Sequence, residues 1–408
     1  MQVLDNDIHA ASPVRSSRPG IRGVAARLFG ARQESRAPLS QAERLLATPS
    51  IAIGVIGSGK VGTALLEQLR EAIPRLRADA GLDLRVRALA NSRHMWLDQA
   101  NANTQVADGS QLLRVASRRS DLGPFAEHVR GQDAAHAVII DCSASDAVAA
   151  HYPTWLASGI HVVTPNKQAG AGPLDRYQAI RQACSESGAR FRYEATVGAG
   201  LPVIQTLRDL IDTGDQVRAI EGIFSGTLAW LFYRYDGSQA FSQLIHEALE
   251  LGYTEPDPRD DLSGTDVARK LVILAREAGL ALSLHDVQVE SLVPASLAGA
   301  SATEFLARLS EADAAMAERR AGAVSRGKVL RHVARMDEHG HARVGVEEIG
   351  NEHAFAHLRL TDNIVQFSSR RYSDNPLVVQ GPGAGPEVTA AGVFADLLRV
   401  CAGLGARL

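Results

Sequence analysis

The chain has 408 residues, of which 45% are hydrophobic and 22% are charged, and its formal net charge is −3. This length exceeds what one ordinary hydrophobic core accommodates and predicts about two to three domains. The small net charge gives no electrostatic reason to expect nucleic acid or an acidic membrane as a partner. No apolar run approaches the ~20 residues that a membrane-spanning helix needs, so we expect no membrane association.

The three cysteines, Cys142, Cys184 and Cys401, lie far apart in the sequence and form no C-x-x-C pair. They therefore predict neither a disulfide framework nor a thiolate zinc site. This pattern is typical of a reducing compartment, and we expect a cytoplasmic protein.

The first 48 residues differ in composition from the rest of the chain. Met1–Leu46 is rich in Arg, Ser, Ala and Pro and lacks the continuous apolar segment of a secretory signal. Its four acidic residues count against a transit peptide. We predict that residues 1–48 form a flexible N-terminal extension with one short helix around Ile21–Ala31.

From Ser50 onward, short β-branched runs alternate with helical patterns. The predicted strands are Ile51–Ile56, Leu84–Ala90, Ala137–Asp141, Ile160–Thr164 and Phe191–Thr196, and the first predicted helix is Val61–Ile73. Such alternation predicts an α/β fold with a Rossmann-type, doubly wound parallel sheet over residues 49–196.

The next part of the chain mixes strands with longer helices and predicts a second, α+β domain with an open sheet over residues 197–375. Its clearest predicted elements are the helices Val203–Leu210, Phe241–Leu251 and Thr265–Ala278 and the half-buried strand Thr361–Arg371. Residues 376–408, with a glycine-rich loop and one helix in Gly381–Leu404, are expected to return to the first domain.

A glycine-rich turn with the pattern G-x-G-x-x-G joins the first predicted strand to the first helix. It reads Gly57, Ser58, Gly59, Lys60, Val61 and Gly62. The first glycine allows the tight turn, the second lets the backbone approach a pyrophosphate, and the third lets strand and helix pack closely. The helix N-terminus adds N–H donors and a positive dipole end, so the turn predicts dinucleotide binding. Lys60 is either a cation beside the phosphates or a solvated side chain.

The end of the second predicted strand is where an NAD-specific site places an acidic residue on the ribose. Here the chain continues as Asn91, Ser92 and Arg93, with no carboxylate before Asp98. Neutral polar groups and one arginine favour a 2′-phosphate, so we expect NADP, with NAD possible as an alternative.

An acidic segment precedes the helix predicted at Thr265–Ala278. It carries the carboxylates Glu255, Asp257, Asp260, Asp261 and Asp266. Pro256, Pro258 and Gly264 predict a loop over Glu255–Gly264. Asp266 and Lys270 follow at i, i+4 on one helix face, where an ion pair is common surface decoration. Their apolar neighbours instead favour the edge of a cleft, where a lysine can exchange protons and carboxylates can bind an ammonium group.

Six segments together closely resemble the homoserine dehydrogenase family and occur in the family's order. They are the glycine turn, Thr164–Lys167, Glu194–Pro202, Gly222–Leu228, Gly252–Lys270 and Gly381–Gly385. The resemblance runs from Ile51 to the C-terminus and is closest to the dehydrogenase half of the bifunctional aspartokinase–homoserine dehydrogenases. It implies NAD(P)-dependent interconversion of L-homoserine and L-aspartate 4-semialdehyde in threonine, methionine and isoleucine biosynthesis. We expect neither a kinase domain before Ile51 nor a regulatory domain after Gly385.

The resemblance also implies roles for individual residues. Lys270 would exchange the proton on the substrate oxygen, with Lys167 near the nicotinamide and the reacting oxygen, and Asp266 as a third catalytic residue. The substrate's ammonium group would be bound by Glu255, assisted by Asp261 and Asp266, with Thr227 and Lys270 completing the substrate site.

The remaining implied contacts concern the cofactor and a monovalent cation. Ser143, Lys167 and Gly385 match cofactor-contacting positions. The backbone carbonyls of Glu194, Val197, Ala199 and Leu201 would hold a structural sodium or potassium ion. A homodimer formed through the second domain is expected from the family.

Three other classes of protein fit the sequence less well than a homoserine dehydrogenase does. A semialdehyde dehydrogenase with a thioester intermediate needs an activated cysteine, whereas Cys142 ends a buried strand without a histidine motif. A nucleotide-binding scaffold that had lost catalysis would not be expected to retain Lys167, Lys270 and the acidic segment. A zinc alcohol dehydrogenase is rejected because the 13 histidines form no ligand-spaced motif.

Overall fold

The computed structural model describes residues 50–98, 109–116, 118–131 and 134–408. The extension predicted over residues 1–48, with its helix at Ile21–Ala31, lies outside these ranges. The described residues belong to one compact unit that contains two separate β-sheets. Within these ranges, no helix has the length and apolar character needed to cross a bilayer.

The first sheet has seven strands in the order β4-β3-β2-β1-β5-β6-β7. Its strands are β1 (Ser50–Ile56), β2 (Asp83–Ala90), β3 (His94–Leu97), β4 (Arg118–Arg119), β5 (His136–Asp141), β6 (His161–Val163) and β7 (Phe191–Arg192). β2, β1, β5, β6 and β7 run parallel, which confirms the predicted Rossmann-type sheet. β3 and β4 are antiparallel additions that the sequence reading missed. Only three residues separate β2 from β3, too few for the crossover that a parallel neighbour requires.

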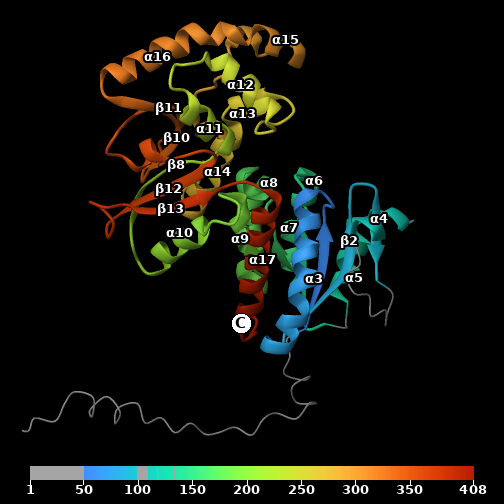
Figure 1. Cartoon of the computed structure of the whole chain (residues 1–408). Coiled ribbons are helices and arrows are strands. Elements are labelled where there is room, and N and C mark those ends of the chain that lie inside the picture. Colours follow the sequence, from blue (N-terminus) through green and yellow to red (C-terminus); the bar gives the residue numbers. More distant parts are fainter. Residues whose placement is uncertain (1–49, 99–108, 117, 132–133) are drawn as a thin grey trace, which may run out of the picture. The chain divides into compact units, whose positions relative to one another are not determined.

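Helices cover both faces of this sheet. They are α3 (Lys60–Ala80), α4 (Gly109–Val115), α5 (Leu122–Arg130), α6 (Asp146–Ala149), α7 (Tyr152–Ala157), α8 (Lys167–Ala171), α9 (Leu174–Ser187) and α17 (Pro386–Gly403). Side chains of β1 alternate between the two faces. Ile51 and Ile53 pack with the core of α3 and α17, while Ala52 packs with the core that includes Phe125 of α5. Figure 1 shows α3 and α17 side by side on one face, so the last helix of the chain completes the layer begun by the first one described.

The helix predicted at Val61–Ile73 is longer than the sequence suggested. α3 continues through Pro74 to Ala80 and ends where Gly81 adopts a left-handed φ of 60°. Buried Leu76 extends the apolar stripe beyond the proline, so packing outweighs the lost backbone hydrogen bond. The strand predicted over Phe191–Thr196 is shorter than expected, because a 3-10 turn, η1 (Glu194–Thr196), follows β7.

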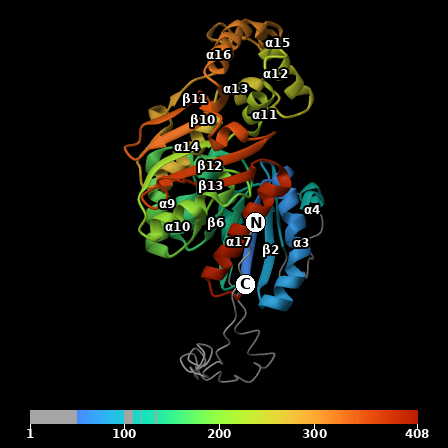
Figure 2. The ribbon, with the colours of Figure 1, turned by 60° about the vertical axis from the view of Figure 1, so that its left-hand side comes forward.

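The second sheet is open, as predicted, with the order β13-β12-β8-β10-β11-β9. Its strands are β8 (Val217–Ile223), β9 (Gln288–Val289), β10 (Lys328–Asp337), β11 (Ala342–Gly350), β12 (Asp362–Ser369) and β13 (Leu377–Pro382). Its pairings are antiparallel except for β11 with β9. Because β13 pairs with β12, the predicted return to the first domain at residue 376 falls one strand too early. The chain rejoins the first sheet only at α17 (Figure 2).

Helices and short turns accompany the second sheet. They are α10 (Val203–Asp212), α11 (Gly226–Arg234), α12 (Phe241–Glu250), α13 (Pro258–Leu262), α14 (Thr265–Glu277), α15 (Ala302–Arg308) and α16 (Asp313–Ser325), with 3-10 turns η2 (Leu284–Asp286), η3 (Ala295–Leu297), η4 (Leu309–Ala312) and η5 (Ala354–His357). α14 packs against α8, one of the helices that cover the first sheet, and this contact joins the helices that accompany the two sheets.

The prediction that Glu255–Gly264 is entirely a loop was wrong. α13 occupies Pro258–Leu262, and the Asp257 side chain caps it by accepting a hydrogen bond from Arg259 N at 3.1 Å. Pro258 stands at the first helical position, where the missing N–H costs nothing and the fixed φ is favourable. A residue interpreted as a helix breaker therefore begins a helix.

Candidate functional site

The glycine turn lies between β1 and α3, and each of its glycines has a different constraint. Gly57 has a φ of +94°, in the left-handed region. A Cβ on Gly62 would lie 1.9 Å from the carbonyl oxygen of Gly57, so only glycine fits. A Cβ on Gly59 would meet no atom within 4 Å, so packing inside the protein does not require glycine there. Open space at the second glycine is what close approach by a ligand phosphate requires.

The N-terminus of α3 is prepared to bind an anion. Gly59 is its N-cap and supplies no side-chain cap, so the first N–H groups of the helix are left for a ligand. Ser58 is half-buried, and Lys60 is exposed beside the turn. The side chain of Val61 packs against the core under α3 and supports the helix.

The predicted ribose-reading residues form the tight turn between β2 and β3. Asn91 Oδ1 accepts hydrogen bonds from the backbone N–H groups of Arg93 and His94, both at 2.8 Å. Asn91 therefore shapes the turn, and Ser92 and Arg93 are exposed on it. The nearest carboxylate along the chain, Asp98, is engaged by Arg87 at 3.2 Å and is not available to a ribose hydroxyl.

Ser143 lies at the carboxyl end of β5, next to the glycine turn. A Cβ on Gly57 would lie 2.8 Å from Ser143 N, which places these two predicted cofactor positions side by side. Ser143 N donates to the buried carboxylate of Asp141 at 2.8 Å. Burial raises the pKa of the intervening Cys142 thiol far above its ordinary value. A thiol held in its protonated form is a poor nucleophile, which argues against the thioester chemistry of an aldehyde dehydrogenase.

A buried polar network that the sequence reading missed holds the start of α8. Asp141 Oδ2 accepts hydrogen bonds from Tyr152 Oη at 2.6 Å and from Asn166 Nδ2 at 3.0 Å. Asn166 in turn caps α8, because its Oδ1 accepts a hydrogen bond from Gln168 N at 3.0 Å. Lys167, the first residue of α8, is thus fixed by the carboxyl end of β5.

Two lysines meet at one carboxylate where α8 packs against α14. Asp266 Oδ2 lies 2.9 Å from Lys270 Nζ, and Asp266 Oδ1 lies 3.4 Å from Lys167 Nζ. Lys270 Nζ also donates a hydrogen bond of 2.7 Å to the carbonyl oxygen of Phe224, which follows β8. An ammonium group has three donors, so Lys270 retains one for a further acceptor. Its side chain is 12% exposed, against 32% for that of Lys167.

The charges in this cluster act on one another. Burial disfavours the charged form of Asp266, but the ammonium groups of Lys270 and Lys167 outweigh this effect and hold the pKa of the carboxyl well below its usual value. Burial lowers the pKa of Lys167, the charge of Lys270 lowers it further, and Asp266 partly offsets both effects. A lysine with a lowered pKa beside a permanent carboxylate is a group suited to exchange protons.

The acidic segment closes around a threonine of α11. Thr227 Oγ1 lies 2.9 Å from Asp261 Oδ1, and Glu255 N donates to Asp261 Oδ2 at 2.8 Å. Asp261 therefore holds the segment in shape, while the Glu255 side chain is exposed. Burial raises the pKa of Asp261, and the charges of Glu255 and Asp266 add to the rise. The structure thus brings the predicted substrate residues Thr227, Glu255, Asp261 and Asp266 into one neighbourhood.

Asn363 of β12 connects this cluster to the C-terminal loop and was not predicted. Its Nδ2 donates to the carbonyl oxygen of Phe224 at 3.2 Å, the same oxygen that accepts from Lys270. A Cβ on Gly383 would lie 2.1 Å from this side chain, so the loop before α17 passes directly over it. Gly385, with a φ of +122°, ends that loop as the N-cap of α17. Nothing in the local sequence marks an asparagine within a strand as part of a site, so Asn363 was not predicted.

η1 and the turn that follows it carry the four predicted cation ligands, Glu194, Val197, Ala199 and Leu201, and are largely buried. Gly198 and Ala199 have φ values of 76° and 53°, so two successive residues are left-handed. For a residue with a side chain this conformation costs on the order of 1 kcal/mol, which the surrounding packing must supply. The Glu194 carboxylate accepts hydrogen bonds from Ile204 N and Gln205 N at the start of α10. These carbonyl and carboxylate oxygens are hard donors of the kind that alkali cations bind.

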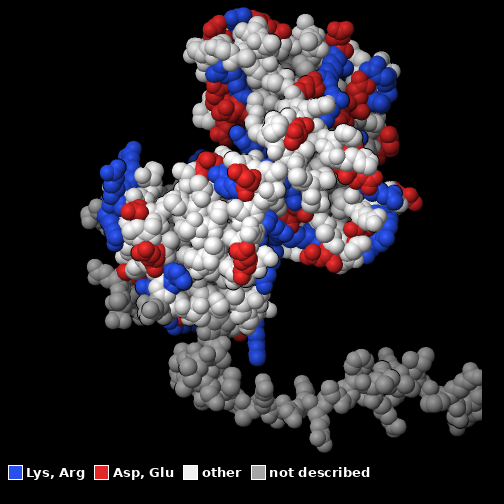
Figure 3. Space-filling view, turned by 180° about the vertical axis from the view of Figure 1, so that it is seen from behind, with Lys and Arg blue, Asp and Glu red and all other residues white. Residues whose placement is uncertain are grey.

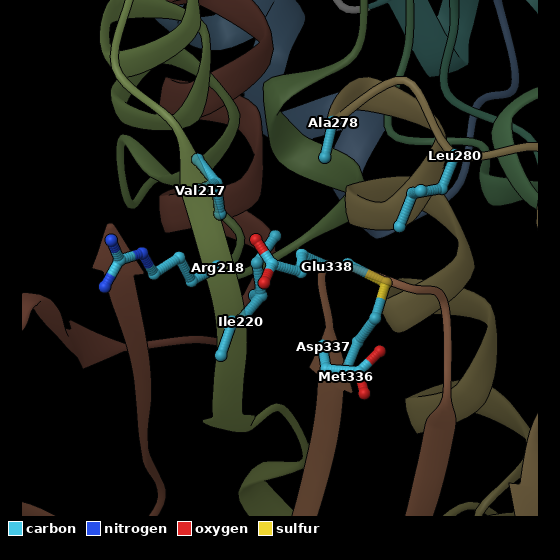
Figure 4. Close-up of a pocket in the computed structure, with 9 residues that line it drawn as sticks. Val217, Arg218, Ile220, Ala278, Leu280, Met336, Asp337 and Glu338 are labelled. Atoms are coloured by element: carbon cyan, nitrogen blue, oxygen red, sulfur yellow. The ribbon is translucent and has the colours of Figure 1, made fainter. Parts of the chain in front are cut away.

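Other features of the described residues are weaker candidates for the active site than the cluster of Lys167, Asp266 and Lys270. A cavity of about 50 Å³ lies at the start of β8 (Figure 4), with Glu338 beside Val217 and Ile220, and it is too small for an amino acid. No group of three His, Cys, Asp or Glu side chains placed to hold a metal occurs within the described ranges. Figure 3 shows acidic and basic side chains interspersed over the face opposite to that of Figure 1. That pattern lacks the continuous basic surface typical of nucleic-acid binding.

Comparison with known proteins agrees with this geometry. A family profile described as homoserine dehydrogenase, NAD binding domain, matches residues 57–194, and one described as homoserine dehydrogenase matches residues 202–398. A crystal structure of a Candida auris protein described as being of unknown function shares 34% identity with a TM-score of 0.80, covering 87% of this chain and 98% of that one.

Two curated relatives show how the match is distributed. The chain is 47% identical over 364 residues to bifunctional aspartokinase/homoserine dehydrogenase 2, chloroplastic, of Zea mays, covering 88% of this chain but 40% of that relative. It is 43% identical over 364 residues to the homoserine dehydrogenase of Emericella nidulans, covering 86% of this chain and 98% of that relative. The chain spans about 40% of the length of the bifunctional relative and nearly the whole of the other. It therefore belongs to the homoserine dehydrogenase family, whose members are NAD(P)-dependent oxidoreductases.

Proposed function

We propose that this protein interconverts L-homoserine and L-aspartate 4-semialdehyde, using NADP in preference to NAD. The observation that carries the proposal is the cluster of Lys270, Asp266 and Lys167 at the packing of α14 against α8. This cluster places two ammonium groups and one carboxylate beside a nucleotide-binding fold, within a chain that belongs to the corresponding family.

Lys270 would act as the acid and base on the reacting oxygen. Two of its three donors are engaged by Asp266 and by the carbonyl oxygen of Phe224, which leaves the third for the substrate. In the reducing direction the ammonium group stabilises the negative charge that develops on the aldehyde oxygen and protonates it. In the oxidising direction the neutral amine accepts the hydroxyl proton. Lys167 adds a second positive charge, and Asp266 orients both lysines.

Glu255 would bind the ammonium group of the amino-acid substrate. Its backbone N–H is fixed by Asp261, which Thr227 also contacts, so the exposed carboxylate of Glu255 projects from a shaped segment. Asp266 adds a negative charge at the same site. An amino acid with both an ammonium group and a reactive carbon a few bonds away can contact Glu255 and Lys270 together.

The cofactor would be held by the glycine turn and the surrounding loops. The free N–H groups at the start of α3 suit the pyrophosphate, Ser143 and Gly385 line the same region by family resemblance, and exposed Arg93 suits a 2′-phosphate. When bound, the nicotinamide ring supplies or accepts the hydride at the carbon that carries the oxygen. The protein's part is to orient the substrate and to control the proton.

Three further assignments belong to the proposal. The backbone carbonyls of Glu194, Val197, Ala199 and Leu201 would bind a sodium or potassium ion, which the strained turn at Ala199 supports. A homodimer through the second sheet is expected from the family. A cytoplasmic location is supported by the three free thiols. The ligand acted on would be a small amino acid, and we propose neither nucleic acid nor a membrane as a partner.

The test follows absorbance at 340 nm with L-homoserine and either NADP or NAD. The matched control for Lys270→Ala is Lys328→Ala, which removes a half-buried lysine from β10, outside the lysine cluster. We expect NADPH formation by the native protein and by the control, and a loss of about 10²-fold or more in kcat for Lys270→Ala. No turnover with either cofactor, in protein that binds NADP, would instead support a nucleotide-binding scaffold without catalysis.

A further inference from the structure

A second, larger cavity lies at the opposite edge of the first sheet from β4. It has a volume of about 440 Å³ and is bounded by the end of α9, by β7 and by α10. Figures 1 and 2 show α9 and α10 next to one another. Its lining consists of Arg181, Cys184, Ser185, Gly188, Ala189, Arg190, Phe191, Arg192, Gln205, Arg208 and Asp212. None of the residues assigned above to substrate, cofactor or cation is among them. We call this cavity the arginine pocket.

Four guanidinium groups converge on the arginine pocket from three elements. Arg192 is in β7 and Arg190 immediately precedes this strand, and both side chains line the cavity. Arg181 comes from α9 and Arg208 from α10. β7 is the last strand of its sheet, and its free edge leaves room for the flanking helices to bring these side chains together.

The positive charge of the arginine pocket is only partly neutralised. Arg208 is bound to Glu277 of α14, at 2.5 Å between Nε and Oε1. Arg192 has one long contact, 3.5 Å to Gln205 Oε1. Within the described ranges, the guanidinium groups of Arg181 and Arg190 make neither a hydrogen bond nor an ion pair. The lining offers a single carboxylate, that of Asp212, against four guanidinium groups.

The chemistry of the ligand follows from these donors. Burial lowers the pKa of Arg192, and the charges of Arg208, Arg399 and Arg190 add to this effect, while Asp396 opposes it. Crowded cations of this kind are relieved by a bound anion. Guanidinium groups bind carboxylates and phosphates through paired N–H donors, and a volume of this size suits a small metabolite.

We propose that the arginine pocket is a binding site for a small oxyanion with more than one negative charge. Its ligand carries phosphate or several carboxylate groups, and Gln205 adds an amide at the same wall. The site lies apart from the lysine cluster but is connected to it. Arg208 is shared between the pocket and Glu277, and Glu277 is on α14, the helix that also carries Asp266 and Lys270.

The test is isothermal titration calorimetry of the full chain with inorganic phosphate and, separately, with citrate. Ionic strength is held constant with chloride, and NADP is present at saturation so that the N-terminus of α3 is occupied. The double variant Arg181→Gln/Arg190→Gln removes two exposed charges and leaves in place the side chains that form the hydrogen bonds between Arg208 and Glu277. Arg359→Gln, an exposed arginine beyond η5, is the matched control.

We expect one saturable site per chain, with affinity reduced about tenfold or more in the double variant and unchanged in the control. Binding of phosphate alone assigns a phosphate-bearing ligand, and tighter binding of citrate assigns a polycarboxylate. If both variants unfold at the same temperature as the native protein, their folds are intact. The absence of saturable binding with either anion, or equal affinity in the double variant, overturns the proposal.

Discussion

Asp266 and Lys270 are one turn apart on α14, and their charged groups are 2.9 Å apart although the Asp266 side chain is 44% exposed. The same carboxylate also faces Lys167, which follows β6 almost a hundred residues earlier in the chain. The Asp266 carboxylate thus joins Lys167 of α8, a helix that covers the first sheet, and Lys270 of α14, a helix that accompanies the second sheet, in one charge cluster. Because its own pKa is held well below its usual value, Asp266 stays ionised at neutral and alkaline pH and remains a charged partner of both lysines.

Asp266→Asn tests this arrangement. Loss of the carboxylate removes the charge that favours the ammonium form of Lys167, so the pKa of Lys167 falls further below its ordinary value. We expect kcat for homoserine oxidation to drop by about 10- to 100-fold because Lys270 loses the carboxylate that orients it, and the limb of the pH profile that reports Lys167 to move to lower pH. The measurement is the rate at 340 nm between pH 6 and pH 10. A profile that keeps its shape would show that Asp266 does not control the lysines.

The glycine turn allows a matched pair of variants. Gly62→Ala forces a methyl group against the carbonyl oxygen of Gly57, and we expect it to reduce the free energy of unfolding by about 2–4 kcal/mol. Gly59→Ala has open space, and we expect nearly native stability with NADP binding weakened about tenfold or more. Urea unfolding and fluorescence titration with NADP separate the two effects. Native cofactor affinity in Gly59→Ala would show that the backbone there does not approach the phosphates.

Arg93→Gln tests the choice of cofactor. The arginine is exposed on the turn after β2, and no acidic residue there is available to bind a ribose hydroxyl. We expect KM for NADP to rise about tenfold because a charged contact to the 2′-phosphate is lost, while KM for NAD changes little. Steady-state kinetics with both cofactors give the ratio. An equal rise in both KM values would assign Arg93 to a role unrelated to the 2′-phosphate.

His332 of β10 predicts a dependence of stability on pH. Burial lowers its pKa to about 4, and its Nε2 has no partner among the described residues. The unfolded chain, with a pKa near 6.5, binds more protons than the folded one between these values. The free energy of unfolding therefore falls as pH drops from about 6.5 toward 4, with a limiting slope of about 1.4 kcal/mol per pH unit from this group.

His332→Phe removes this titrating group and retains an aromatic ring beside Phe232. We expect the loss of stability between pH 7 and pH 5 to be smaller in the variant than in the native chain. Urea unfolding at the two pH values measures the difference. His161, whose pKa burial also lowers to about 4, retains its own contribution in both proteins. Identical pH dependence in the two chains would show that His332 is not protonated on unfolding in this range.

The parts of the fold that the sequence predicted are those with strong local patterns. The β-branched run of β1, the glycine turn and the apolar spacing of α3 lie within 31 residues and depend on neighbours in the chain. β3 and β4 were missed because they have only four and two residues, too few to show a strand pattern, and they pair in sequence onto β2. α13 was missed because Pro258 was interpreted as a breaker, although Asp257 before it is a good helix cap.

Only part of the candidate site could be predicted from local sequence patterns. The i, i+4 pair on α14 follows from spacing. The meeting of Lys167 with Asp266 is a long-range contact that was not predicted, because the family resemblance placed Lys167 only near the reacting oxygen. The network of Asp141, Tyr152 and Asn166 gave no local signal, because its members come from three segments that the sheet brings together. Asn363 was missed for the same reason.

The position of α17 has a consequence for how the chain is made. Buried Val393 and Leu397 share a core with Ile51 and Leu65, so the nucleotide-binding layer contains residues from both ends of the described chain. A nascent chain that has emerged as far as β7 has all the strands of the first sheet, but the face covered by α3 still lacks α17. That half of the protein can finish folding only after residues 193–385 and α17 itself have been synthesised, so premature termination anywhere before Pro386 would expose apolar surface to aggregation.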